Sequence, residues 1–184
     1  MEDHQPMTPE EVIRQRRKKL ADKTAVTSFF SRLAAFLILM WLLFGAVFGI
    51  APMKNDDMKP RLSVGDLMLF YRLENTWHTQ DIIVFEKNGV RYTGRIIAMG
   101  GDTVEITDNA ELKINNSTVV ESDIYYSTGQ YEDSDVTYPV TLGKDQFFVL
   151  CDYREGAKDS RYFGPVSLKE VKGKVISVIR RSNL

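Results

Sequence analysis

Cysteine and histidine are scarce in this 184-residue chain, and their scarcity excludes several kinds of chemistry. Cys151 is the single cysteine, so no disulfide forms within the chain, and an exported domain must draw its stability from a packed core. The two histidines, His4 and His78, stand in no spacing with cysteines or acids that is typical of a metal site. A glycine-rich phosphate loop is also missing, so the sequence predicts no cofactor and no metal.

A strong net charge is missing as well, because 24 lysines and arginines are balanced by 25 aspartates and glutamates. The part of the chain after residue 51 is mildly acidic, with 17 basic and 20 acidic residues. Such a domain is poorly suited to a polyanion, so we do not expect nucleic acid as a partner.

Charge is wholly absent from residues 33–51, which read LAAFLILMWLLFGAVFGIA. As a helix rising about 1.5 Å per residue, this stretch reaches roughly 28 Å, close to the thickness of the hydrocarbon core of a bilayer. A buried core helix has a polar stripe, and a cleaved signal peptide has a shorter apolar run followed by a small-residue cleavage site. The sequence therefore predicts a retained transmembrane anchor over 33–51.

Basic residues gather immediately before this anchor, and basic flanks stay on the cytoplasmic side of a membrane. We therefore expect a single-pass protein of the cell membrane, with residues 1–32 as a cytoplasmic basic tail and 52–184 as an extracellular domain. Residues 1–13 are polar and predicted to be disordered, although Thr8 and Pro9 are typical of the capped start of a short helix. The basic residues are Arg14, Arg16, Arg17, Lys18, Lys19, Lys23 and Arg32.

Short segments rich in β-branched and aromatic residues follow the anchor, separated by glycine and asparagine turns. This pattern predicts a mainly β, antiparallel domain, with a hairpin turn at Asn88-Gly89 and one helical turn at 167–172. We expect 108–145 to form a satellite lobe. Its tyrosine-rich stretch 122–139 is interpreted as an irregular excursion, whose tyrosines either pack the lobe or form a recognition surface. The predicted strands are 67–71, 81–85, 90–99, 103–106, 112–114, 147–150 and 175–179.

Four segments resemble, in order, the four soluble motifs of type I signal peptidases, the membrane-anchored serine proteases that remove leader peptides. Residues 57–66 (DMKPRLSVGD) are similar to Ser-Met-x-Pro-Thr-Leu followed by Gly-Asp, and 81–85 (DIIVF) to Asp-Ile-Val-Val-Phe. Residues 92–104 (YTGRIIAMGGDTV) are similar to Tyr-x-Lys-Arg-Val-Ile-Gly-x-Pro-Gly-Asp-x-Val. Residues 151–164 are similar to Gly-Asp-Asn-Arg and Ser-x-Asp-Ser-Arg-x-x-Gly. The resemblance implies the signal-peptidase β fold.

The chain departs from this family at the catalytic positions. The resemblance places Asp57 where the family has its nucleophilic serine, Gly94 where it has its general-base lysine, and Ala157 where it has the serine that orients the lysine. Losing one member of such a unit removes most of its rate enhancement. We therefore predict a signal-peptidase fold without signal-peptidase chemistry and with no catalytic residues.

Other constellations do not replace the lost one. Asp56 and Asp57 are adjacent, and adjacent residues of an extended chain point to opposite sides, whereas an aspartic dyad shares one proton between two carboxyls. Cys151 stands at a glycine-like position and is interpreted as a buried free thiol. The resemblance also implies four residues that brace the fold: Asp152, Arg154, Asp159 and Arg161.

Active relatives bind an extended segment of their substrate as an added β-strand, and backbone pairing needs no catalytic side chain. We expect a groove that holds a partner segment in this way, with volume emptied at Gly94. A carboxylate in this groove needs a partner or water, and Arg95, Lys59 and Lys158 are the candidate partners of Asp57. The residues assigned to the groove are Asp57, Met58, Pro60, Tyr92, Gly94 and Arg95.

With Asp and Gly at two catalytic positions, the chain resembles the SipA-type proteins encoded with pilins and sortases in Gram-positive bacteria. That resemblance implies a pilus-assembly chaperone or accessory factor whose partners are pilin subunits or the pilus sortase. Two alternatives stay open. One is an active peptidase of exported precursors with non-standard catalytic residues, and the other is a membrane protein whose outer domain only spaces its partners.

Overall fold

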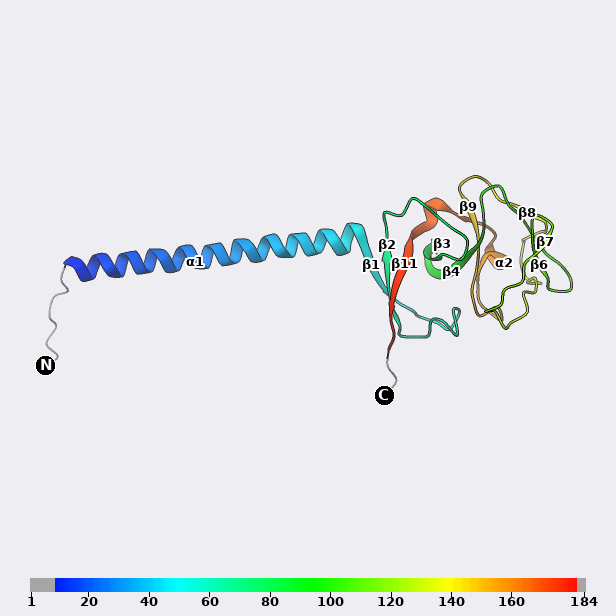
Figure 1. Cartoon of the computed structure of the whole chain (residues 1–184), viewed down its shortest axis with the longest axis horizontal. Helices are drawn as coiled ribbons and strands as arrows, with labels where there is room; N and C mark the ends of the chain where they lie inside the picture. Colours follow the sequence, from blue (N-terminus) through cyan, green and yellow to red (C-terminus); the bar gives the residue numbers. More distant parts are fainter. Residues whose placement is uncertain (1–8, 182–184) are drawn as a thin grey trace. The chain divides into compact units, whose positions relative to one another are not determined.

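The computed structural model describes residues 9–181, which divide into two compact units between Phe44 and Gly45. The described part of the first unit is helical: α1 runs over Pro9–Leu42, and a π-helical turn, Leu43–Val47, follows it and crosses the boundary into the second unit (Figure 1). The stretch Pro9–Val47 is long and apolar enough to cross a membrane. The described part of the chain is already helical at Pro9, and Thr8, the predicted cap, lies outside the described residues.

Two boundaries that the sequence predicts for this helix are wrong. Residues 9–13, predicted to be disordered, form the first turns of α1. The helix also ends before the predicted anchor does, because Phe48–Pro52 forms strand β1 and pairs with residues 67–71. This pairing satisfies the backbone groups of β1 that face β2. An apolar pattern alone does not distinguish such a strand from a continued helix.

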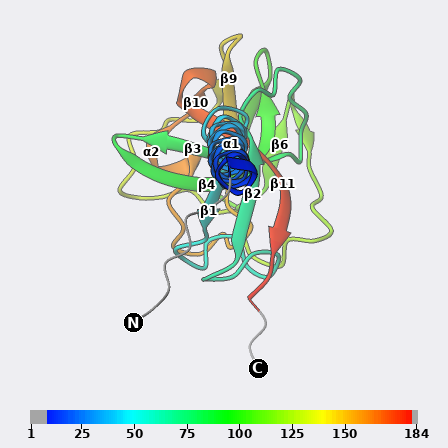
Figure 2. The ribbon, with the colours of Figure 1, turned by 90° about the vertical axis from the view of Figure 1, so that its left-hand side faces the viewer.

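The second unit, here called the β domain, is built on a seven-stranded antiparallel sheet in the order β1-β2-β11-β3-β4-β9-β10. Strand β11 lies beside β2, so the C-terminal end of the described chain pairs with the beginning of the β domain (Figure 2). The remaining strands are β2 Leu67–Tyr71, β3 Ile82–Lys87, β4 Val90–Met99, β9 Gln146–Leu150, β10 Val166–Ser167 and β11 Val171–Ile179.

A smaller four-stranded sheet lies at the end of the β domain remote from β1, in the order β7-β6-β5-β8 (Figure 1). It begins at Thr103, so it includes a strand that precedes the expected lobe 108–145. Val104, Ile106 and Leu112 from this sheet pack against Phe148 and Leu150 of β9. The strands are β5 Thr103–Ile106, β6 Leu112–Ile114, β7 Ser117–Thr118 and β8 Val140–Thr141.

The mainly β, antiparallel fold class is confirmed, and its local turns follow the sequence closely. Asn88 and Gly89 join β3 to β4 with φ of 52° and 77°, the left-handed pair that a two-residue hairpin turn requires. The predicted helical turn is a 3₁₀ turn, Leu168–Glu170, closed by a capping box from Ser167 to Glu170. A further short helix, α2, spans Ser160–Phe163.

The tyrosine-rich stretch 122–139 contains no strand or helix. Three of its four tyrosines pack on the core. Tyr126 contacts the Tyr153 ring, Tyr138 contacts the Phe148 ring, and Tyr131 lies under the guanidinium of Arg161. Tyr125 is 80 % exposed, so a recognition role for this stretch rests on that side chain.

Candidate functional site

The loop between β1 and β2 carries Asp57. Its ends are tied where the Met53 N–H donates to the Asp66 carbonyl at 2.8 Å and the Gly65 N–H donates to the Met53 carbonyl at 2.9 Å. Within the loop, the side chain of Met58 is fully buried in the core under β1 and β2, which anchors the neighbouring backbone. The Asp57 carbonyl accepts from the Tyr153 N–H at 2.9 Å, joining the first signal-peptidase-like motif to the fourth.

The Asp57 carboxyl is half-buried and accepts a short hydrogen bond from the side-chain amide of Asn55. Burial raises the pKa of Asp57, the Asn55 amide lowers that pKa in part, and the nearby charges of Asp159 and Asp56 raise it further. Asp56 points to Lys59 instead, at 2.8 Å, so the two adjacent carboxyls share no proton.

The prediction that a cation pairs with Asp57 is wrong, because all three candidate side chains make other interactions. Cation and carboxylate proximity in sequence says little about which pairs form once the loop and strands have folded. Asp57 is held by a neutral amide. Lys59 pairs with Asp56, Arg95 pairs with Asp152, and Lys158 lies 4.4 Å from the centre of the Tyr162 ring.

Gly94 lies in the middle of β4, opposite Ile83 of β3. A Cβ atom at this position would lie 2.6 Å from Cγ1 of Val149 and 3.2 Å from the carbonyl oxygen of Leu150. The expectation that glycine leaves emptied volume in a groove is therefore wrong. The side chain of Val149, from the neighbouring strand β9, occupies that space.

Ala157 and Cys151 belong to the same buried cluster as Met58, so this cluster brings the first and fourth motifs together. The Ala157 carbonyl accepts from the Tyr131 hydroxyl at 2.6 Å. The Cys151 thiol is free and 1 % exposed, as expected, and lies 3.5 Å from the Thr93 carbonyl. Burial raises the pKa of Cys151 well above its usual value, and the charges of nearby acids add to this, so the group stays a thiol.

Buried charges surround this cluster, and each is fully partnered. Arg95 forms a bidentate pair with Asp152 at 2.8 and 2.5 Å and donates to the Gln80 carbonyl at 3.0 Å. Arg161 forms a bidentate pair with Asp159, both contacts at 2.9 Å. Removing one partner of such a pair leaves an uncompensated buried charge.

Arg154 ties the core to the tyrosine-rich side of the domain. Its guanidinium donates to the Cys151 carbonyl at 2.6 Å, the Thr128 hydroxyl at 2.7 Å and the Glu121 carboxylate at 2.8 Å. The Arg161 side chain likewise reaches the Gly129 carbonyl at 3.2 Å. The four residues expected to brace the fold therefore all lie in buried, hydrogen-bonded networks.

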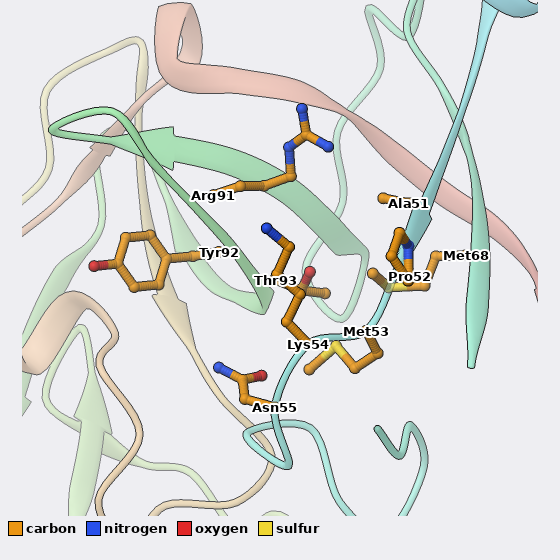
Figure 3. A pocket seen from close by; sticks show the side chains of 9 residues that line it. All are labelled: Ala51, Pro52, Met53, Lys54, Asn55, Met68, Arg91, Tyr92 and Thr93. Atoms are coloured by element: carbon orange, nitrogen blue, oxygen red, sulfur yellow. The ribbon is translucent and has the colours of Figure 1, made fainter. Parts of the chain in front are cut away.

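The predicted groove is not assembled from the predicted residues. Met58 is buried in the core, and Arg95, which is also buried, lines a different pocket beside Gln80 and Glu121. A shallow pocket instead lies between the end of β1 and the start of β4, and Tyr92 is the predicted residue that lines it (Figure 3). We call this pocket the edge groove. Its lining residues are Ala51, Pro52, Met53, Lys54, Asn55, Met68, Arg91, Tyr92 and Thr93.

Asn55 connects the edge groove to Asp57, since it lines the groove and donates its amide to the Asp57 carboxyl. Lys54 and Arg91 are the functional candidates that sequence reasoning missed. Both lie within three residues of a motif position, but their shared location depends on β1 and β4 coming together. Residues 9–181 contain no group of three or more His, Cys, Asp or Glu placed to hold a metal ion.

Comparisons with known proteins agree with these motifs. The sequence model of the family described as "Signal peptidase, peptidase S26" matches residues 26–179. "Signal peptidase I P" of Bacillus subtilis subsp. natto is 26% identical over 167 residues, which cover 85% of this chain and 90% of that protein. "Inactive signal peptidase IA" of Staphylococcus aureus (strain Mu50) is 26% identical over 162 residues, covering 83% and 90%. The crystal structure of a signal peptidase I from Enterococcus faecalis V583 is 31% identical and covers 56% of this chain and 98% of that chain, with a TM-score of 0.46.

Proposed function

Because the chain belongs to the S26 family of signal peptidases, we propose that it holds an extended polypeptide segment as that fold does, without cleaving it. The observation that carries this proposal is the environment of Gly94. A lysine side chain at residue 94 would begin inside the volume of Val149, so the position is packed for glycine. Asp57 and Ala157 offer no hydroxyl nucleophile and no hydroxyl to orient a base.

The similarity to a relative named "Inactive signal peptidase IA" supports this proposal, because that name describes a family member without peptidase activity. An active peptidase with non-standard residues needs a base near Asp57. The Asp57 carboxyl instead accepts a hydrogen bond from the Asn55 amide, which is neutral and cannot act as that base. Cys151 is a poor nucleophile in that setting, because burial keeps it protonated. The non-catalytic function therefore accounts for more of the geometry.

Asp57 acts in this proposal as an organiser of the groove and not as a reacting group. Its carboxyl holds the Asn55 side chain at the wall of the edge groove, and its carbonyl holds the fourth motif through the Tyr153 N–H. The stability cost of half-burying this carboxylate is, in this proposal, retained because the carboxylate positions the groove.

The biological role that we propose is that of a membrane-anchored chaperone or accessory factor in sortase-dependent pilus assembly, with pilin subunits or the sortase as partners. The helical stretch Pro9–Val47 contains an uncharged part, from residue 33 onward, and is long and apolar enough to cross a membrane, which supports an anchored protein. Its basic flank supports a cytoplasmic N-terminal tail and an extracellular β domain. The pilus role rests on the resemblance to SipA-type proteins, which also have Asp and Gly at the positions of residues 57 and 94.

The test is a deletion strain complemented with wild type, Asp57→Ala, or Asp56→Ala as the matched control. Asp56 is the adjacent carboxylate and pairs with Lys59 at the surface. We expect the deletion to lose pilus polymerisation while pilin leader peptides are still removed. Wild type and Asp56→Ala should restore polymerisation, and Asp57→Ala should not.

Two outcomes would contradict the proposal. Leader peptides that stay uncleaved in the deletion strain, with cleavage restored by wild type, would identify an active peptidase. Full rescue by Asp57→Ala, combined with loss of function when the α1 anchor is exchanged for an unrelated one, would identify a spacer whose groove has no role.

A further inference from the structure

The first half of β4 has an open backbone edge. Because a two-residue turn joins β3 to β4, Lys87 and Val90 form a hydrogen-bonded pair, and the alternation along the hairpin turns the backbone groups of Arg91 and Thr93 away from β3. Strand β9 pairs with β4 only from Arg95 onward among the described residues. The Thr93 carbonyl accepts from the Cys151 thiol, which confirms its outward direction. The Thr93 N–H and the Arg91 N–H and carbonyl face the opening.

The end of β1 has an open edge as well. β1 is the first strand in the sheet order and pairs with β2 alone. Both backbone groups of Met53 are turned toward the loop that leads to β2, so the groups of Pro52 and Lys54 point the other way. Proline has no N–H to leave unpaired, which suits an edge position. An extended chain entering the edge groove therefore meets free backbone groups on two sides.

Two exposed cations flank this opening. Lys54 extends from its loop toward β4, where Arg91 and Thr93 lie (Figure 3). In the part of the chain that the structure describes, neither Lys54 nor Arg91 makes an ion pair. Both carboxyls of the loop interact elsewhere, since Asp57 accepts a hydrogen bond from Asn55 and Asp56 pairs with Lys59, so the cations are left for a ligand.

We propose that the segment held in the edge groove is acidic, with its carboxylates paired by Lys54 and Arg91. This inference rests on the proposed function, since it names the chemistry of the segment that the groove holds. In an extended segment, side chains two residues apart lie on one side about 6.6 Å apart, so carboxylates at alternate positions reach one flank of the groove. The open strand edges favour a polypeptide over a lipid headgroup, which would use the charges and leave those edges unpaired.

The effect expected from these contacts is moderate. Exposed ion pairs contribute modestly to binding, so two of them together change the dissociation constant by about two- to thirtyfold, with tenfold inside that range. The change must shrink as salt is added, because exposed charges are screened. Backbone pairing, in contrast, does not depend on the charge of the ligand.

The experiment uses the full-length protein in nanodiscs of neutral phosphatidylcholine and two fluorescent decapeptides, one alternating Val and Glu and the other alternating Val and Gln. Anisotropy gives each dissociation constant at low and at high NaCl concentration. The variants are Lys54→Gln with Arg91→Gln and, as the matched control, Lys144→Gln with Lys169→Gln. The control changes the same charge at exposed residues outside the groove.

At low salt, wild type and the control should bind the Glu peptide about tenfold more tightly than the Gln peptide. At high salt, the ratio of the two dissociation constants should be smaller. The groove variant should bind both peptides as wild type binds the Gln peptide. Equal binding of the two peptides by wild type, or a preference that survives in the groove variant, would overturn the acidic segment while leaving peptide holding intact. Binding of neither peptide would overturn the proposed function itself. A loss in the groove variant of affinity for phosphatidylglycerol vesicles, without any peptide preference, would reassign the cations to lipid.

Discussion

Replacing Gly94 by alanine places the new Cβ atom 2.6 Å from Cγ1 of Val149. The backbone at Gly94 is not in the left-handed region, so alanine suffers no conformational strain there, and the usual gain of about 0.4 to 1 kcal/mol from a stiffer unfolded chain applies. Overpacking of a buried site costs about 1 to 3 kcal/mol. We therefore expect Gly94→Ala to lower the free energy of unfolding by about 1 to 2 kcal/mol.

Val149→Ala is the complementary change. Val149 is fully buried, and removing two methyl groups costs about 2 to 3 kcal/mol in transfer and cavity terms. In the double variant, the methyl group introduced at residue 94 occupies part of the space that the valine side chain vacates. The loss should then fall short of the sum of the single losses by at least about 1 kcal/mol, since the two sites are in contact.

Urea unfolding of the full-length protein in detergent measures these losses, with Trp77 as the fluorescent reporter and Trp41→Phe in every variant. Trp77 packs against Phe147, with ring centroids 5.7 Å apart, so its emission follows the β domain. Gly129→Ala is the control, because a Cβ there has no atom within 4 Å. Single losses that add to within about 0.5 kcal/mol in the double variant would refute the packing argument for Gly94.

Three further outcomes follow from the buried groups. Arg95→Met should lower the free energy of unfolding in urea by about 3 to 5 kcal/mol, because it leaves the buried Asp152 carboxylate without a cationic partner. Lys59→Ala, which breaks an exposed ion pair, should lower it by less than about 1 kcal/mol. Burial raises the pKa of Asp57 above its unfolded value near 4, so the charged carboxylate destabilises the folded state above the raised pKa and has no such effect below about pH 4. The free energy of unfolding of Asp57→Asn relative to that of wild type should therefore grow as pH rises from about 4 to 7. A difference between the two proteins that is constant with pH would argue against this. The Cys151 thiol should react with iodoacetamide at neutral pH only on unfolding, and rapid labelling of the native protein, followed by mass spectrometry, would contradict its burial.

The local elements of this protein are largely predictable from sequence because their causes are local. Short runs of large apolar, aromatic and β-branched residues, bounded by turn residues, produce β2 and β4 with the predicted bounds, and Asn88-Gly89 produces the predicted hairpin. The uncharged stretch and its basic flank indicate the apolar helix. The end of that helix was not predictable, because Phe48–Pro52 is apolar in either conformation and only β2 makes it a strand.

By itself, then, the sequence determined the β fold, the apolar helix and the order of the motifs, and it predicted that residues 57, 94 and 157 stand in place of catalytic residues. The tertiary structure decided what surrounds those positions. Asn55 and not a cation holds Asp57, Val149 fills the space beside Gly94, and Lys54 and Arg91 both line the edge groove. Such partners come from strands and loops distant in sequence, and which of them become neighbours depends on sheet order and register, which local patterns do not encode.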